Sequence, residues 1–472
     1  MKKNKNQFLK LNLSFSMYCI IGIIILFNIE NSKHTIYYKE YIVLSISYFL
    51  VAAISFWSII SKKIDIFQPY ILISILYLCI FIFTPMIFII NGKTDAHGTD
   101  VMGGCIKATI IFVFSYIAFT IGYIKYKVKL INPKFTTKFI MTEYIRKKTV
   151  IISCYIWIIS YLLTILHLIS SGKNIIQILT IGGIGATNTY GSNSLLGFVS
   201  NFSFCMIIPW MYICFLSKNK LLKIIITYLT ATAYIIRGFR YIIIIMIVAF
   251  AITYYRKRNK KPGVLIIILG VISLLVFIGA LGYMRNNLRT GVGTEWNSFG
   301  IDKILYALES NFDIYKTFYA IVEHYPAEYS YTFGKSMFFE TIIMFVPRMF
   351  WPNKPLAIDA SVVLAIRRSV SEFAITNAAM ATPNIGEFYV DFGIIGCIIF
   401  MFILGVVAKW TTKYYFAPNN NIKYIILYSV IMPTFLQLII RGYTPSNFYL
   451  VIFLLMPYKI INILVANKFV IS

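Results

Sequence analysis

Runs of about 20 apolar residues recur along nearly the whole chain, and no other feature constrains the fold as strongly. An α-helix needs about 20 residues to cross the roughly 30 Å hydrocarbon core of a bilayer. The predicted spans are 13–29, 41–60, 69–90, 104–124, 149–170, 195–216, 222–236, 240–255, 263–283, 387–408, 424–440 and 446–465. The sequence therefore predicts an all-α, polytopic membrane protein with about 12 transmembrane helices.

The composition supports this prediction over a soluble fold. Only 13% of the 472 residues are charged, where a soluble domain carries about a quarter. All seven cysteines fall inside apolar runs, so we interpret them as buried apolar side chains, with disulfides or a metal site as the alternatives. The formal net charge of +27 reflects Lys and Arg in short loops between the spans, so no nucleic-acid partner is expected.

Loop charge predicts the orientation of the chain. Short loops on one side of the spans hold 27 Lys and Arg, which places that side and both termini in the cytoplasm. The opposite side has a medium loop, 171–194, and a long one in which 301–322 and 337–350 are predicted helices, the second on the membrane surface. The predicted organisation is helices one to nine in 1–283, an outer loop in 284–386, and helices ten to twelve in 387–472.

Arginine is concentrated on the outer side. The chain has 33 Lys and 11 Arg, yet only three of the 27 cytoplasmic cations are Arg. The other eight are Arg237, Arg240, Arg285, Arg289, Arg348, Arg367, Arg368 and Arg441. Because a guanidinium is a planar fork that matches phosphate oxygens two at a time, this bias predicts a phosphate-bearing ligand on the outer face. The alternative is Arg paired with carboxylates or with lipid head groups.

Acidic residues gather in the same region, since 11 of the 17 lie between Glu295 and Asp391. Glu387 and Asp391 are four residues apart at the start of the tenth span, so a helix places both on one face. We predict Glu387 as a general base, with a carboxylate stabilised by its helix dipole as the alternative. His324 is a second candidate base, with an inert surface histidine as the alternative. The sequence contains neither HExxH nor GxSxG, and no acidic pair of the DxD type on the outer face to hold a metal.

Two stretches resemble a known family. The first is VPRMFWPNKP at 346–355, and the second is TPNIGEFYVDFG at 382–393, followed by Gly396. Both are similar to the Wzy-type O-antigen and capsule repeat-unit polymerases, as is the turn at 237–240 between two short spans. The similarity in topology covers essentially the full chain and implies a GT-C-like membrane fold.

The resemblance implies a glycosyltransferase that moves a growing glycan from undecaprenyl diphosphate to a lipid-linked repeat unit. No metal or nucleotide cofactor is expected, and the partners are undecaprenyl-diphosphate-linked oligosaccharides, membrane lipids and a chain-length regulator. On this hypothesis the donor diphosphate contacts Arg237, Arg240, Arg285 and Arg289, and Glu387 deprotonates or orients the acceptor hydroxyl. Arg348 and Arg441 complete the site or hold the loop. Trp351 and Tyr389 stack on sugar rings, with anchoring at the membrane interface as the alternative.

Two other functions remain open at this point. A ligase-like transferase shares this architecture but delivers the glycan to a different acceptor. A flippase for lipid-linked oligosaccharides typically shows two similar halves and charged residues at mid-membrane. The chain shows no internal repeat, which favours an enzyme over a transporter.

Overall fold

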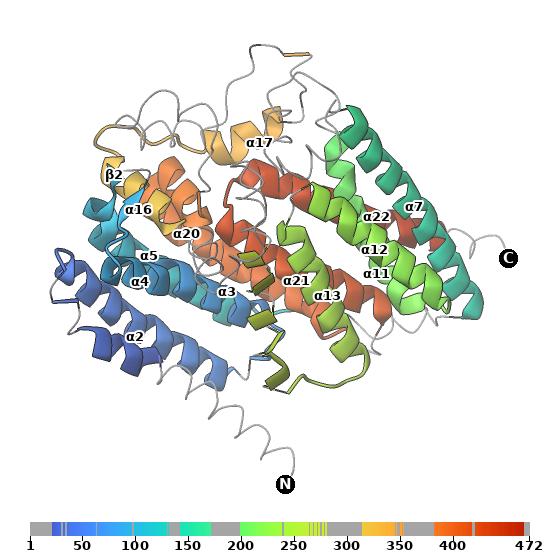
Figure 1. The fold of residues 1–472 in the computed structure, drawn as a ribbon, viewed down its shortest axis with the longest axis horizontal. Helices are drawn as coiled ribbons and strands as arrows, with labels where there is room; N and C mark the ends of the chain where they lie inside the picture. Colours follow the sequence, from blue (N-terminus) through green and yellow to red (C-terminus); the bar gives the residue numbers. More distant parts are fainter. Residues whose placement is uncertain are drawn as a thin grey trace, which may run out of the picture.

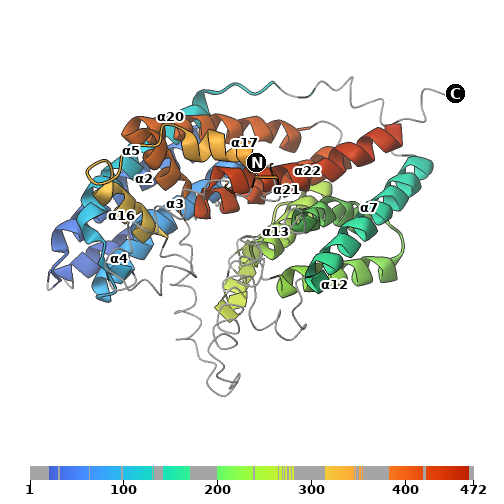
Figure 2. The same ribbon diagram turned by 90° about the horizontal axis from the view of Figure 1, so that it is seen from above.

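The computed structural model describes residues 21–29, 32–131, 142–170, 199–280, 314–353 and 382–466, with short gaps inside these ranges. Within this part of the chain the secondary structure is helical except for two antiparallel two-residue strands, β1 (Asp95–Ala96) and β2 (Thr99–Asp100). Figures 1 and 2 show the helices packed side by side in one bundle. The predicted all-α architecture is confirmed for these residues.

Seven helices in the described ranges are long and apolar enough to cross a membrane. They are α2 (Tyr38–Ser61), the continuous run of α3 (Pro69–Leu78), η1 (Cys79–Phe83) and α4 (Thr84–Ile90), η2 (Met102–Gly104) with α5 (Cys105–Lys125), α7 (Glu143–Ser170), α20 (Asn384–Tyr415), α21 (Ile422–Ile440) and α22 (Thr444–Ala466). They coincide with the predicted spans two to five and ten to twelve, which are helices of the length and composition that crossing a membrane requires.

The sixth to eighth predicted spans are shorter helices. The sixth is formed by η3 (Ser200–Met206) and α11 (Ile207–Leu216). The next two are α12 (Lys220–Ile236) and α13 (Arg240–Lys257), separated at the predicted turn. Only parts of the first and ninth spans lie in the described ranges, so the total of about 12 and the GT-C-like arrangement stay predictions.

Three elements of the long outer loop are described. α16 (Tyr315–His324) covers the second half of the predicted helix 301–322, and η5 (Lys335–Phe339) and α17 (Glu340–Ile343) lie within or beside the predicted helix 337–350. α16 sits directly on η2, because a Cβ at Gly104 would collide with the carbonyl oxygen of Tyr319. Lys107 at the start of α5 donates to the carbonyl oxygen of Val322 at 3.2 Å, in the last turn of α16. This part of the outer loop is therefore docked on the membrane bundle.

The helices α5 and α20 form the tightest pair in the bundle. The long part of α20, residues 394–415, runs parallel to α5. The Lys107 ammonium at the start of α5 lies 5.8 Å from the ring of Tyr389, just before that part begins, and Lys409 near its end lies 4.9 Å from the Tyr123 ring near the end of α5. A shared direction is what the predicted alternation of the fourth and tenth spans requires. Figure 2 shows the two helices side by side.

Glycines line the contact between these two helices. A Cβ at Gly122 would collide with the carbonyl oxygen of Phe402, and a Cβ at Gly405 would collide with that of Phe119. Lipid tails are as apolar as Leu, so helices inside a membrane gain stability from close packing rather than from leaving water. The glycines permit that packing.

The helix α20 is broken at Gly393. This residue has φ +62° and ψ −150°, a backbone conformation essentially restricted to glycine, and a Cβ here would lie 2.9 Å from the Tyr331 ring. Residues 384–392 form a short helix before the break, and residues 394–415 form the long one after it. The predicted tenth span corresponds mainly to the second helix.

The short helix folds back along the long one. The Sγ of Cys397 donates to the carbonyl oxygen of Ile385 at 3.4 Å, and the amide nitrogen of Asn384 lies 3.7 Å from the Met401 sulfur. Asn384 is thereby level with a residue eight positions beyond the break, or about 12 Å along the long helix at 1.5 Å per residue. The beginning of α20 therefore lies inside the bundle and not at its end.

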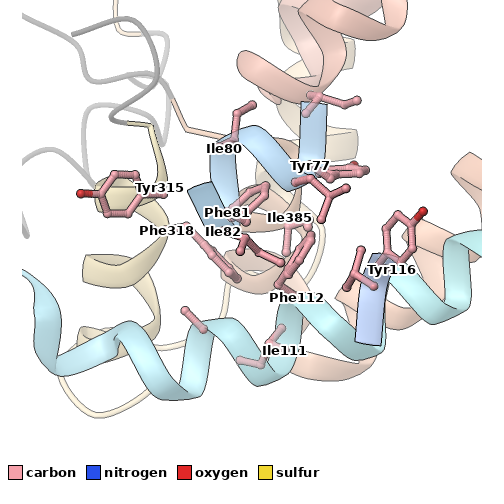
Figure 3. Close-up of a cluster of buried hydrophobic side chains, with 14 of the residues drawn as sticks. Tyr77, Ile80, Phe81, Ile82, Ile111, Phe112, Tyr116, Tyr315, Phe318 and Ile385 are labelled. Atoms are coloured by element: carbon pink, nitrogen blue, oxygen red, sulfur yellow. The ribbon is translucent and has the colours of Figure 1, made fainter. Parts of the chain in front are cut away.

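An aromatic core holds this buried beginning in place. Figure 3 shows Ile385 among side chains from α3, η1, α5 and α16. The Phe81 and Phe112 rings stack with centroids 5.0 Å apart, and Phe318 meets Phe81 edge-to-face at 5.7 Å. Ile385 itself is fully buried. Three separate segments of the chain are thus packed against the start of α20.

Replacing Gly405 by Leu should force α5 and α20 apart. Overpacking of this kind costs about 1–3 kcal/mol, so we expect a lower midpoint of thermal unfolding for the purified protein in detergent. Gly263→Leu is the matched control, since a Cβ there meets nothing within 4 Å. Equal midpoints for the two variants would show that this helix contact does not stabilise the fold.

Candidate functional site

Polar side chains converge where α22 begins. The first turns of α22 contact α17 and η5 from the outer loop, and the turn between α21 and α22 contacts the start of α20. Figure 1 shows α17 beside the beginning of α22. Parts of the chain that lie more than 100 positions apart in sequence meet here.

Glu387 caps α22. Its two carboxylate oxygens each accept the backbone N–H of Thr444 at 3.0 Å, and the Thr444 hydroxyl donates to Oε2 at 2.6 Å. Thr444 is the first residue of α22, so its N–H has no acceptor within its own helix. The Glu387 carboxylate, only 5% exposed, thus satisfies a backbone group at the start of a neighbouring helix.

Asp391 caps η5 in the same way. Its Oδ1 accepts the N–H of Ser336 at 3.3 Å and its Oδ2 accepts the N–H of Met337 at 3.0 Å, while the Thr332 hydroxyl also donates to it. The side chain is fully buried. Glu387 and Asp391 both lie in the short helix of α20, as the sequence predicted. The helix ends that they stabilise belong to neighbouring helices instead of α20 itself.

The turn between α21 and α22 is held at several points. The N–H of Gly442 donates to the carbonyl oxygen of Thr382 at 2.7 Å, and a Cβ at Gly442 would collide with the backbone of Asn384. The Tyr443 hydroxyl donates to Glu340 of α17 at 2.6 Å. Within this turn the side chain of Arg441 is exposed. Arg441 is therefore a predicted site residue whose side chain is exposed and whose backbone is held in place.

Arg237 is buried beside η3. It follows α12, is 3% exposed, and donates from Nη1 to the carbonyl oxygen of Ser200 at 2.7 Å. Ser200 begins η3, which packs on α22 through Phe202 and Phe453, whose ring centroids lie 5.1 Å apart. Arg237 is therefore connected to α22 through η3.

The remaining predicted arginines cannot be placed at the site. The backbone of Arg240 begins α13, but its side chain lies outside the described part of the chain. Arg285, Arg289 and Arg348 also lie outside the described residues, as do Arg367 and Arg368. Their assignment to a ligand stays a prediction.

The predicted sugar-stacking residues differ in exposure. Tyr389 is 1% exposed and its ring packs edge-to-face on Tyr331 at 5.9 Å, so it offers no free face in this arrangement. Trp351 is half-buried, as are Tyr329 and Tyr331. Burial, together with the hydrogen bond to Tyr389, raises the pKa of Tyr331 to about 12, so its hydroxyl is protonated at neutral pH. Tyr329 and Tyr331 therefore have accessible surface, whereas Tyr389 does not.

The remaining candidate groups are the histidine predicted as a second base, possible metal ligands and the cysteines. The Nδ1 of His324 lies 2.8 Å from Oε1 of Glu328, four positions further along the chain. Across the described ranges, no group of three or more His, Cys, Asp and Glu side chains is arranged to hold a metal ion. The cysteines placed in those ranges are free thiols.

Sequence reasoning missed several contacts that hold the site. The Asn384 amide donates to the Tyr77 hydroxyl at 2.8 Å, which fixes the start of α20 to α3. Glu340 accepts from Tyr443, and Asp391 accepts from η5. Each of these partners is at least 54 residues away in sequence, so no local pattern signals the pair.

The fold and the site define an integral membrane protein in which the turn carrying Arg441 is held by the carboxylates of Glu387 and Glu340, where the outer loop meets the bundle. The chain belongs to the family described as O-antigen polysaccharide polymerase Wzy, whose family model matches residues 11–469. This membership confirms the resemblance seen at 346–355 and 382–393. No curated protein and no solved structure matches the chain.

The Gly442→Ala variant tests whether the turn must lie against α20. The added methyl group collides with the backbone of Asn384, so we expect the turn to move outward and the bond after Arg441 to become open to trypsin. Limited trypsin digestion of the protein in membranes measures this directly. Gly270→Ala is the control, because its Cβ meets nothing within 4 Å. Identical digestion patterns would show that the turn tolerates the extra carbon without moving.

Proposed function

We propose that this protein polymerises oligosaccharide repeat units on the outer face of the cell membrane, with both termini in the cytoplasm. The growing glycan is transferred from undecaprenyl diphosphate to a sugar hydroxyl of an incoming lipid-linked repeat unit. Family membership supports polymerisation of lipid-linked repeat units. The observation that carries the site is an exposed Arg441 on a turn that Thr382, Glu340 and Glu387 hold in place.

The chemistry requires positive charge at the leaving group. The acceptor oxygen forms a bond to the anomeric carbon while the bond from that carbon to the diphosphate oxygen breaks. The lipid diphosphate departs with the bonding electrons, and the hydroxyl proton passes to a base. Fixed guanidinium groups stabilise the charge that develops on the diphosphate, because they need no reorganisation during the reaction.

The proposed assignments follow from the Arg distribution. Arg237, Arg240, Arg285 and Arg289 contact the donor diphosphate, while Arg348 and Arg441 complete the site. Trp351 offers a partly exposed ring to a sugar. Burial of Tyr389 favours a packing role for that residue, with Tyr329 or Tyr331 as the ring that meets the sugar.

Two alternative functions are weaker. Family membership favours a polymerase over a ligase-like transferase and over a flippase. Deleting the gene separates all three. A missing polymerase leaves single repeats attached to their final acceptor, a missing ligase leaves long chains on the lipid carrier, and a missing flippase leaves single repeats inside the cell.

Replacing Arg441 by Ala should abolish long chains while leaving single repeats. Loss of a charge-assisted contact in the transition state typically costs about 10²–10³ in rate. The measurement is the ladder of surface glycan lengths on a gel after the variant gene is returned to the deletion strain, with protein amount checked in membranes. Arg258→Ala is the control, because that arginine lies on the predicted cytoplasmic side against the Tyr254 ring. A normal ladder from the Arg441 variant would remove this residue from the site.

Metal independence is tested with a chelator. If arginines supply the charge at the diphosphate, polymerisation by the purified protein should continue at an unchanged rate in excess EDTA. A metal-dependent glycosyltransferase assayed in parallel serves as the control for complete chelation. Loss of activity that added Mg²⁺ or Mn²⁺ restores would assign the leaving-group charge to a metal ion instead.

A further inference from the structure

We propose that Glu387 is a positioning residue, which holds the turn carrying Arg441 against α20. It does not take the proton from the acceptor. This inference rests on the proposed function in one respect, namely that Arg441 contacts the anionic substrate. It differs from the base role suggested by the position of Glu387 in the sequence.

The lone pairs of Glu387 are engaged by the helix that it caps. A carboxylate has about four lone-pair positions, and Thr444 donates to three of them, through its N–H to both oxygens and its hydroxyl to Oε2. A general base has to present a lone pair to the proton that it removes. The hydrogen bonds to Thr444 direct both oxygens of Glu387 toward α22.

The capped residue lies close to the proposed ligand contact. Thr444 is three positions after Arg441, and the only residues between them are Gly442 and Tyr443. Gly442 is tied to the carbonyl oxygen of Thr382 at 2.7 Å. The turn is therefore fastened at two points, by the carbonyl oxygen of Thr382 just before α20 and by the carboxylate of Glu387 within α20. Removing the carboxylate frees one of these fastenings.

Asp391 provides a matched comparison within the same short helix. It is also buried, and it also accepts backbone N–H groups at the start of a neighbouring element. The element that it caps is η5, whereas Arg441 precedes α22. Any general effect of removing a buried capping carboxylate from this helix should appear at Asp391. An effect that acts through Arg441 should appear at Glu387 alone.

The experiment compares Glu387→Gln with Glu387→Ala in the full-length protein in membranes, supplied with lipid-linked repeat units. Gln keeps a carbonyl oxygen for Thr444, so we expect polymerisation within about tenfold of the natural protein and a pH profile of unchanged shape. Ala has no acceptor, and we expect a loss of about 100-fold. A general base contributes about 10²–10⁴ in rate, so inactivity of Glu387→Gln in a folded protein would overturn the proposal.

Coupling to Arg441 supplies the second readout. In an Arg441→Ala background, Glu387→Ala should reduce the residual rate by less than about threefold, because its effect acts through the missing guanidinium. Asp391→Ala should reduce the rate by the same factor in both backgrounds. Effects of Glu387→Ala that multiply independently of Arg441 would contradict a positioning role.

The two proposals can fail separately. If Arg441→Ala polymerises normally, the proposed site is wrong, and positioning is then judged from the turn itself. Glu387→Ala should increase trypsin cleavage after Arg441, while Asp391→Ala should leave that cleavage unchanged. If neither variant changes the cleavage, Glu387 does not position the turn. Glu387→Gln keeps the acceptor oxygen for Thr444, so comparing it with Glu387→Ala separates a loss of positioning from misfolding of the protein.

Discussion

The structure depends on satisfying backbone groups where helices begin inside an apolar bundle. A bilayer offers no water to an unpaired N–H, so each helix that begins inside the protein needs an internal acceptor. α22 begins beside the buried start of α20, and η5 begins beside the break at Gly393. Glu387 and Asp391 supply the acceptors for these two beginnings. In return, the N–H groups stabilise two carboxylates that would be costly to bury alone.

The hydrogen bonds between these carboxylates and the helix beginnings explain why a broken helix lies at the centre of the proposed site. An unbroken α20 would carry Glu387 and Asp391 toward the end of the bundle. The break at Gly393 turns the first nine residues of α20 back along the rest, where they reach the turn between α21 and α22. The outer loop, α20 and α22 then share one polar junction, and Arg441 projects from it with an exposed side chain.

Much of this fold is predictable from local pattern. The apolar runs predicted seven helices that are long and apolar enough to cross a membrane, and the residues at 237–240 predicted the separation of α12 from α13. The fold-back of α20 was not predictable, because a lone glycine inside a helical pattern is usually tolerated, and the partners that stabilise the break, such as Tyr331, lie far away in sequence. For the same reason the four-residue spacing of Glu387 and Asp391 showed their shared helix but not the two helices that they cap.

The packing of α16 on η2 has a consequence for exchanging segments of this chain with those of other family members. The carbonyl of Tyr319 occupies the space that a side chain at position 104 would fill, and Lys107 meets the last turn of α16 at Val322. The described part of the outer loop that contains α16 is therefore not an independent insert. A chimera that takes α16 from another member of the family would keep this contact only if residues 102–107 were exchanged with it.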